Sequence, residues 1–236
     1  MKIRLGFSTG ALYQSGLNEK GKLEAIKKAG CRSAELGFIR LAEFFKGEPE
    51  NLTAEDFHDL DYVSLHAPKH NYGYNSVTRR VFKQIEKLSK VRAFNLVVFH
   101  PDDVENFEVF KDTGFKVAFE NMDNRKKSYK EVAELEDLFA QFPDFNMVLD
   151  VNHAFSNDST LKLVADFYKK LGHKIAQVHL SGYDGYHSPL FQTNQPEIVR
   201  SIRDFSAPII IESILVETDL KQERDYVLQI INGMGK

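Results

Sequence analysis

The sequence predicts an α/β protein in which eight parallel strands alternate with helices and close into a (β/α)8 TIM barrel, forming a single domain over residues 1–236. Three observations predict this fold. Eight short apolar runs recur along the chain, each followed by a helical segment. No linker separates these units, and 236 residues is a usual length for one such barrel. Six of the eight runs end in a histidine or a carboxylate.

The strands are predicted from short apolar runs with β-branched residues, which are typical of buried parallel strands. We expect them at Ile3–Ser8, Ser33–Phe38, Tyr62–His66, Leu96–His100, Lys116–Glu120, Met147–Asp150, Ile175–Leu180 and Ile209–Glu212. An open, doubly wound sheet is the alternative arrangement for the same alternation of strands and helices. No glycine-rich phosphate-binding motif follows any of these strands, which disfavours that alternative.

The helices are predicted from apolar residues at helical spacing and from the residues at their ends. The helix Asn18–Ala29 ends at Gly30, and the helix Thr160–Leu171 carries its apolar residues on one face. A proline is well placed in the first turn of the helix Pro196–Asp204. The other helical segments are expected at Ile39–Lys46, Ala54–His58, Ser76–Lys90, Val104–Lys111, Lys130–Phe139 and Asp219–Ile231.

The composition indicates an ordinary globular protein, because 42% of the residues are hydrophobic and 28% are charged. The formal net charge is −3, and no long basic run indicates a nucleic-acid-binding tail. The only cysteine, Cys31, excludes an intramolecular disulfide and a cysteine-based zinc cluster. Any metal must therefore be bound by histidines and carboxylates. The N-terminal run carries charges and no apolar run has the length of a membrane span, so we expect a cytoplasmic protein without membrane contact.

Side chains that bind metals stand at the ends of six predicted strands. From the third strand to the eighth they are His66, His100, Glu120, Asp150 with His153, His179 with Asp184 and His187, and Glu212. Because the C-terminal ends of the strands of a barrel meet at one face, we expect these groups to share one mouth. Each group would be costly to bury alone, whereas imidazoles and carboxylates together suit a divalent cation.

A purely structural interpretation exists for part of this set. Asp150 can cap the next helix, and His153 can be a hydrogen-bonded core histidine. Outside the set, His58 and His173 are expected on the surface, and Cys31 is expected to be a small buried residue. The phenylalanines are expected to fill the core.

The strand-end motifs resemble the endonuclease IV family, the apurinic/apyrimidinic endonuclease family 2 branch of the xylose isomerase-like TIM barrels. The resemblance lies in H-A-P after the third strand, F-H-P after the fourth, E-N after the fifth, L-D-x-x-H-A-F after the sixth, V-H-L in the seventh and P-I-I-I-E in the eighth. These motifs occur in order over nearly the whole chain.

The resemblance implies a metal-dependent phosphodiester hydrolase with two or three zinc ions, Mn or Mg being the alternatives. It implies one ion on His66, His100 and Glu120, and a second on Glu120, Asp150, His179 and Glu212. It implies a third ion on His153, with Asp184 and His187 as companions. Glu120 and Glu212 are the catalytic candidates. This chain has one extra residue between Asp184 and His187, which puts the third ion in question.

The proposed substrate is a phosphodiester, with abasic DNA and a role in DNA repair implied by the resemblance. Three divalent ions carry about +6 against roughly −4 from the carboxylates, which leaves a positive pocket suited to a phosphodiester. The features that would hold DNA are weak: the loop Thr9–Asn18 has Tyr13 but no lysine or arginine. The candidates elsewhere are Lys69, His70, Tyr72 and Tyr74 in the loop after the third strand, and the basic helix positions Arg79, Arg80, Lys83 and Lys87.

Two other functions remain open. The same superfamily contains sugar and sugar-phosphate isomerases and epimerases, which resemble this chain at Glu120, Asp150, His179 and Glu212. Those residues would hold one ion beside which carboxylates shuttle a proton. A barrel that keeps a metal for structure or sensing and catalyses nothing is the third possibility.

Overall fold

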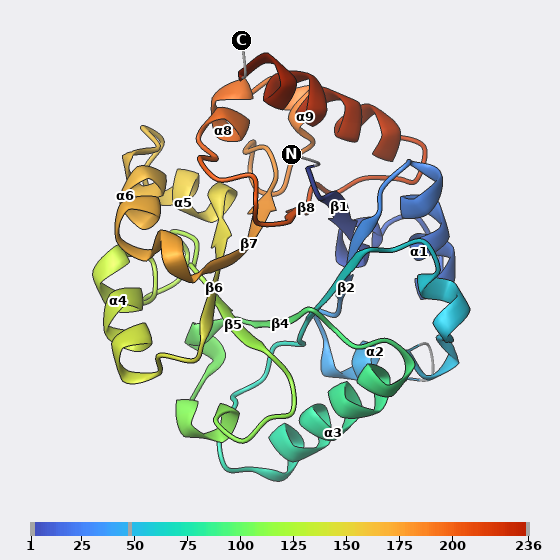
Figure 1. The fold of residues 1–236 in the computed structure, drawn as a ribbon, viewed down its shortest axis with the longest axis vertical. Helices are drawn as coiled ribbons and strands as arrows, with labels where there is room; N and C mark the ends of the chain where they lie inside the picture. The colour runs from blue at the N-terminus through green and yellow to red at the C-terminus, as the bar shows by residue number, and fades with distance from the viewer. Residues whose placement is uncertain (1–2, 47–48, 235–236) are drawn as a thin grey trace.

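In this computed structural model, which describes residues 3–46 and 49–234, eight strands form a closed parallel barrel in chain order (Figure 1). The strands are β1 (Leu5–Ser8), β2 (Ser33–Gly37), β3 (Tyr62–His66), β4 (Leu96–Phe99), β5 (Val117–Glu120), β6 (Asn146–Asp150), β7 (Ile175–Leu180) and β8 (Ile209–Ile211). Strand β1 pairs with both β2 and β8, so the ring is closed and the open sheet is excluded. The predicted TIM barrel is confirmed, and each predicted strand ends within two residues of an observed one.

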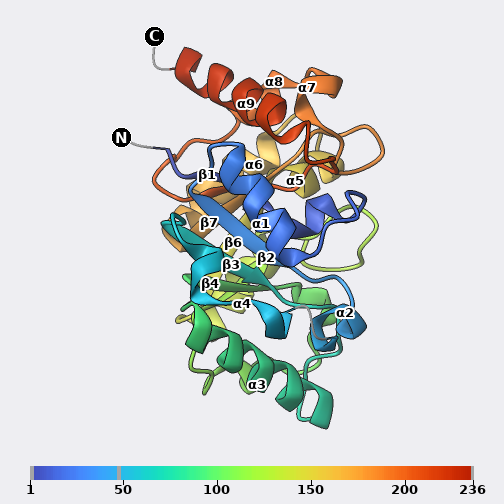
Figure 2. The same cartoon turned by 90° about the vertical axis from the view of Figure 1, so that its right-hand side faces the viewer.

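Helices surround the ring of strands (Figure 1). They are α1 (Glu19–Lys28), α2 (Leu41–Phe45), α3 (Ser76–Val91), α4 (Val132–Gln141), α5 (Val151–Asn157), α6 (Lys162–Leu171), α7 (Leu190–Thr193), α8 (Pro196–Arg200) and α9 (Leu220–Met234). Short 3-10 helices are η1 (Thr9–Leu12), η2 (Pro49–Asn51), η3 (Ala54–Phe57), η4 (Pro101–Asp103), η5 (Phe107–Phe110) and η6 (Gly172–Lys174). Figure 2 shows α3 and α9 at opposite ends of the molecule, with α7 and α8 beside α9.

Three helical predictions need correction. The helix predicted at Pro196–Asp204 is shorter and ends at Arg200 as α8. The segment Val104–Lys111 forms only the short helix η5, because Asn106 has an extended backbone and its side chain accepts a hydrogen bond from the backbone N–H of Glu108 at 2.9 Å. The sequence also did not predict α5 as a separate helix. Leu161 adopts a left-handed conformation with φ 61°, so α6 begins only after it.

The core has an outer and an inner part. The outer part lies between the strands and the helices and contains a cluster of phenylalanines, in which the ring centroids of Phe99 and Phe110 are 4.8 Å apart. The inner part includes a separate apolar cluster of Leu96, Val98, Ala118 and Val148 from β4, β5 and β6. The prediction that phenylalanines fill the core is confirmed for this cluster.

The structure also bears on the predictions for Cys31, His58 and His173. Cys31 is buried, while His58 and His173 are exposed, as predicted. Among the described residues, no helix has the length and apolar character needed to cross a lipid bilayer.

Candidate metal centre

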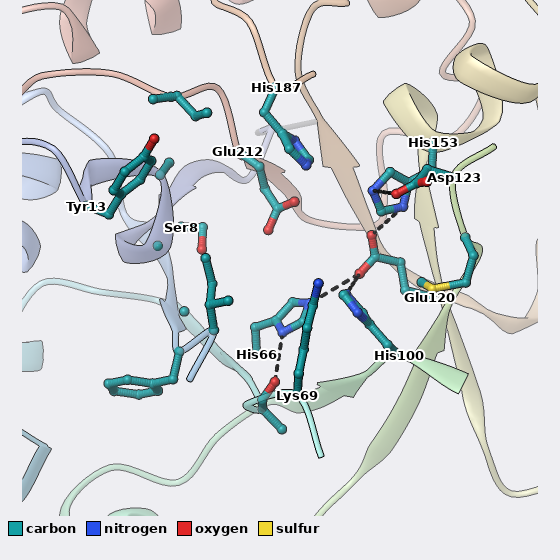
Figure 3. Close-up of a pocket in the computed structure, with 18 of the residues that line it drawn as sticks. Ser8, Tyr13, His66, Lys69, His100, Glu120, Asp123, His153, His187 and Glu212 are labelled. Atoms are coloured by element: carbon teal, nitrogen blue, oxygen red, sulfur yellow. Dashed lines mark hydrogen bonds and ion pairs between the residues drawn. The ribbon is translucent and has the colours of Figure 1, made fainter. Parts of the chain in front are cut away.

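The C-terminal ends of the strands surround a cavity of about 190 Å³ (Figure 3). His66 and Glu120 end β3 and β5, and His100 and Glu212 directly follow β4 and β8. Their side chains line this cavity together with those of His153 and His187. The prediction that groups from distant parts of the sequence share one mouth is therefore confirmed for these six residues.

Glu120 lies at the centre of the cluster. Its Oε2 atom is 3.3 Å from His66 Nε2 and 3.5 Å from His100 Nε2. The same oxygen is 3.5 Å from Nδ1 of His179, and that nitrogen is also 3.5 Å from Glu212 Oε2. Figure 3 shows Glu120 and Glu212 reaching into the cavity from different strands.

Three groups of described residues have the proximity that a metal ion requires; one of them consists of His100, Asp102 and Asp103, and the other two share Glu120. Ligand atoms of His66, His100 and Glu120 lie within 4.8 Å of one another, and so do ligand atoms of Glu120, Asp150, His179 and Glu212. These groups coincide with the first two ligand sets that the resemblance implies, including the shared Glu120. Ion binding by these residues stays a prediction.

The donor atoms fit a divalent cation. His66 turns Nδ1 to the carbonyl oxygen of Ala67 at 3.2 Å, which leaves Nε2 facing Glu120. Nδ1 of His179 is buried and has no hydrogen-bond partner among the described residues. A buried polar atom without a partner is costly, and a cation between these nitrogens and carboxylates would satisfy it. Histidine nitrogens and carboxylate oxygens are also the ligands that Zn²⁺ and Mn²⁺ accept.

Mutual interactions shift the pKa values in the cluster. Burial opposes the charge on Glu120, but the positive charges of His179 and His153 outweigh it and lower the pKa of Glu120 well below its ordinary value. Burial raises the pKa of Glu212 to about 8. Burial also opposes the charge on His153, but Asp150 and Glu120 raise its pKa to about 10. Protons thus balance the carboxylates in the metal-free protein, and a bound cation would displace them.

The structure brings together only part of the third ligand set. The ring centroids of His153 and His187 are 5.7 Å apart. Asp184 is exposed, and its backbone N–H donates to Ser188 Oγ at 3.2 Å. Gly185, Tyr186 and His187 all have positive φ angles, so the chain reverses after Asp184 and carries that carboxylate away from His153. Asp184 is therefore not among the residues that line the cavity, whereas His187 is.

Asp123 occupies the position beside His153 that the sequence analysis predicted for Asp184. Its Oδ2 is 3.9 Å from His153 Nε2. Arg125 donates to both oxygens of Asp123, at 3.1 and 2.8 Å, and its guanidinium carbon lies 3.3 Å from the centre of the Tyr186 ring. Burial would raise the pKa of Asp123, but the hydrogen bonds from Arg125 lower it to about 2. Sequence reasoning missed this group, although Asp123 follows Glu120 by only three residues.

The residues considered for DNA binding are scattered. Lys69 lines the cavity, whereas Tyr72 is a core residue whose hydroxyl donates to the carbonyl oxygen of Pro68. His70 is hydrogen-bonded to Asn75 at 3.1 Å, and Tyr74 is exposed. The basic residues Arg79, Arg80, Lys83 and Lys87 are exposed on α3 and are not among the residues that line the cavity.

No protein-family model matches this sequence, and no curated protein matches it significantly. Solved structures are similar in fold. A D-tagatose 3-epimerase-like protein matches with a TM-score of 0.71 and 19% identity, over 99% of this chain and 100% of the other. Endonuclease IV from Thermus thermophilus matches with a TM-score of 0.66 and 15% identity, over 98% and 99% of the two chains.

D-psicose 3-epimerase from Clostridium cellulolyticum matches with a TM-score of 0.63 and 13% identity, over 96% of this chain and 97% of the other. Sugar epimerases recur among the similar structures. At these identities the likeness concerns the fold. The chain shares its TIM-barrel fold with sugar epimerases and with an endonuclease IV.

Proposed function

We propose that this protein is a metal-dependent isomerase or epimerase that acts on a small sugar or sugar phosphate. The observation that carries the proposal is the convergence of Glu120, Asp150, His179 and Glu212, whose ligand atoms lie within 4.8 Å of one another. Three carboxylates and one imidazole would hold one divalent ion at the inner end of the cavity. The recurrence of sugar epimerases among proteins of the same fold supports this reading over a nuclease.

The chemistry would be proton transfer at a carbon atom beside a carbonyl group. A bound divalent ion would act as a Lewis acid on the oxygens of the substrate. Glu120 and Glu212 both border the cavity, and an oxygen of each lies 3.5 Å from Nδ1 of His179. One carboxylate would take the proton from carbon, leaving an enediolate, and the other carboxyl group would return a proton to that carbon or to its neighbour.

The walls of the cavity suit a small polar molecule. Ser8, Asp123 and His187 offer hydrogen-bonding groups along the wall, and Phe38 and Ile39 provide an apolar side. A few placed polar groups on a mostly apolar surface are typical of small-molecule sites. The volume of about 190 Å³ is at the small end for ligand sites, which favours a compact substrate.

A phosphodiester hydrolase is the second candidate. It is favoured by one specific observation, the group of His66, His100 and Glu120, because a site with a single ion does not need those two histidines. Against it stands the exposed position of Asp184, so that the third ligand set which the resemblance implies is not formed as predicted and Asp123 is the carboxylate beside His153 instead. A barrel that binds metal without catalysis is the third candidate.

The decisive experiment follows solvent exchange. The protein loaded with Zn²⁺, Mn²⁺ or Mg²⁺ is incubated in D2O with a panel of free and phosphorylated aldoses and ketoses, and NMR monitors deuterium at the carbon beside the carbonyl. Abasic duplex DNA is tested in parallel with the same metal-loaded protein. We expect metal-dependent deuterium exchange with at least one sugar and no cleavage of DNA.

Two variants give the test its control. Glu120→Gln and Glu212→Gln are expected to lower exchange by about 10²-fold or more, because each removes a general acid–base group. Ser8→Ala, which changes a wall residue without a carboxylate, should keep exchange within about tenfold of the wild type. Cleavage of abasic DNA without exchange of any sugar would replace this proposal by the nuclease. Metal binding without either activity would favour the non-catalytic barrel.

A further inference from the structure

The barrel interior behind the candidate metal centre is polar over one half. The interior of such barrels is usually filled by branched apolar side chains, as Leu96, Val98 and Val148 do here. On the side of β2, β3 and β7, buried polar side chains take that place: Glu35, Tyr62, Ser64, Gln177 and His179. A polar network in a core is costly unless every member has partners, so this half of the interior calls for a functional explanation.

Glu35 stands at the centre of the network. It is fully buried, and its Oε2 accepts hydrogen bonds from Ser64 Oγ at 3.0 Å and from Gln177 Nε2 at 2.7 Å. The same oxygen lies 3.2 Å from His179 Nε2. Strands β2 and β7 are separated in the ring by β1 and β8, so the contact between Glu35 and His179 crosses the barrel interior. Tyr62 extends the network by donating to Gln177 Oε1 at 2.8 Å.

Stability alone does not account for this carboxylate. Replacing a buried ionic group by well-packed apolar residues is often neutral or stabilising. Two hydrogen-bond donors converge on one oxygen of Glu35 and His179 Nε2 lies 3.2 Å from the same oxygen, an arrangement that favours the ionised carboxylate. Its anionic charge is thus held deep in the barrel, in contact with one residue of the candidate metal centre.

The contact determines how His179 presents its two ring nitrogens. Nε2 faces Glu35, while Nδ1 faces Glu120 and Glu212 at 3.5 Å each. The amide of Gln177 also lies 2.7 Å from Nε2, but its NH2 group donates to Glu35 and cannot accept a proton from the ring. Glu35 is therefore the acceptor for a hydrogen on Nε2. With that hydrogen in place, the lone pair of the neutral ring is on Nδ1.

We propose that Glu35 is a positioning residue for the metal centre. It holds the His179 ring with its hydrogen on Nε2, so that Nδ1 is the metal ligand, and it thereby sets the metal affinity. The inference rests on the metal centre of the proposed function but not on the reaction. Carboxylates that accept from the far nitrogen of a ligating histidine orient the ring and raise its basicity. In this chain the carboxylate comes from the second strand, which contributes no residue to either candidate ligand group.

The test measures metal binding rather than turnover. Glu35→Gln keeps the size of the side chain and removes its charge, and Glu35→Asp keeps the charge on a shorter side chain. Ser64→Ala is the matched control, because it removes a donor to the same oxygen but leaves the pair with His179. Three quantities are measured for each protein. The Zn²⁺ affinity is obtained by competition with a chromophoric chelator. The visible absorption spectrum is recorded for the Co²⁺-loaded form, and the melting temperature is determined for the metal-free form.

We expect Glu35→Gln to bind Zn²⁺ about 10- to 100-fold more weakly and to change the Co²⁺ spectrum, while its metal-free form melts no lower than the wild type. Glu35→Asp should recover part of the affinity, and Ser64→Ala should bind as the wild type does. Unchanged affinity in Glu35→Gln would overturn the proposal. An equal loss in Ser64→Ala, accompanied by a lower melting temperature, would assign Glu35 a merely structural role and overturn it too.

A second measurement uses only the wild type and so does not depend on the folding of a variant. Long-range ¹H–¹⁵N spectra of the zinc-loaded protein report which ring nitrogen of each histidine carries the hydrogen. We expect one metal-bound ring with its hydrogen on Nε2, and its absence would refute the inference. Failure of the proposed function is a separate result, because a protein without isomerase activity can still lose zinc affinity through Glu35→Gln.

Discussion

Asp150 caps helix α5: its Oδ1 accepts a hydrogen bond from the backbone N–H of His153 at 2.8 Å. His153 is itself buried, and its Nδ1 is 2.9 Å from the carbonyl oxygen of Asn121. The sequence offered the cap and core roles as an alternative to metal binding. In the structure the cap coexists with the position of Asp150 in the candidate ligand group, because a carboxylate has two oxygens and the cap uses one of them.

This double role predicts that two substitutions of Asp150 separate stability from metal affinity. Asp150→Asn keeps an oxygen for the cap but removes the charge, so the metal-free protein should melt close to the wild type while Zn²⁺ binds at least tenfold more weakly. Asp150→Ala should lose the same affinity and, in addition, about 1 kcal/mol of stability from the missing cap. Thermal melts of the metal-free proteins and zinc titrations check both. Equal melting temperatures of the two variants would contradict the cap.

Substitution of His100 distinguishes a metal centre with one essential ion from a metal centre with two. It belongs to the group that it forms with His66 and Glu120, and its ligand atoms also lie near those of Asp102 and Asp103, but it is not part of the group that contains Asp150. Under the proposed isomerase, His100→Ala should keep one zinc ion per chain and retain turnover within about tenfold of the wild type. Elemental analysis and the exchange assay provide the measurement. Loss of activity by about 10³-fold with loss of one of two ions would favour the phosphodiesterase.

Removal of metal should weaken the fold as well as abolish activity. The candidate ligands of the two groups that share Glu120 come from six strand ends, so an ion that binds only the folded state stabilises the barrel by linkage. At a free concentration 100 times the dissociation constant this contribution is about 2.7 kcal/mol. Treatment with EDTA should therefore lower the melting temperature, and added Zn²⁺ or Mn²⁺ should restore it. An unchanged melting temperature, together with unchanged activity, would argue against a metal in the native protein.

The sequence was sufficient for the barrel and for the two central ligand groups because both depend on local signals. Each strand is a short apolar run, and strand ends of a closed barrel meet at one face whatever the loops do. Glu120 and Glu212 could therefore be predicted to lie together, although their positions in the sequence differ by 92 residues.

The parts that the sequence could not provide depend on backbone detail or on contacts across the barrel. Asp184 is turned outward by three successive positive φ angles, and Asp123 takes the place beside His153; spacing alone does not encode such a turn. Glu35 stands inside the predicted strand Ser33–Phe38, and its partner His179 is 144 residues away. Only the closed ring of strands brings this pair into contact.

A buried carboxylate far from the cavity gives a pH-dependent prediction. Glu223 of α9 accepts hydrogen bonds from the backbone N–H groups of Leu190 and Phe191, at 2.9 and 3.0 Å, and from the hydroxyl of Ser213. Burial raises the pKa of Glu223 above its ordinary value of 4.5, although these hydrogen bonds act in the opposite direction. The folded state thus binds the proton more tightly than the unfolded state. The resulting stabilisation is complete below pH 4.5 and is lost as the pH rises through the folded-state pKa.

Glu223→Gln removes this titration and leaves one backbone N–H without its acceptor. The variant should be less stable than the wild type by about 1–3 kcal/mol at low pH. The difference in unfolding free energy should shrink as the pH rises, because only the wild type loses stability with its proton. Urea denaturation of both proteins over a pH series measures it. A difference that grows with pH would show that the pKa of Glu223 is lowered by folding.

Substitution of Lys69 tests whether the substrate carries a phosphate group. It lies on the loop after β3, is exposed, and lines the cavity beside His66 (Figure 3). Lys126 lines the same cavity, but its ammonium group is paired with Asp102. An ammonium group at the mouth would bind an anionic substituent, and a charged hydrogen bond of this kind is worth about tenfold or more in binding. Lys69→Ala should therefore raise KM for a phosphorylated sugar by about tenfold and leave KM for its neutral counterpart within about twofold.

Lys126→Ala is the matched control for Lys69→Ala, since the charge that it removes is already balanced by Asp102. It should change the preference between phosphorylated and neutral sugars less than Lys69→Ala does. The measurement is the ratio of kcat/KM for a sugar phosphate to that for the free sugar in each protein. If this ratio of kcat/KM values is the same in Lys69→Ala as in the wild type, Lys69 does not bind a phosphate group at the mouth of the cavity. The compact, mostly apolar walls would then admit the neutral sugar as well.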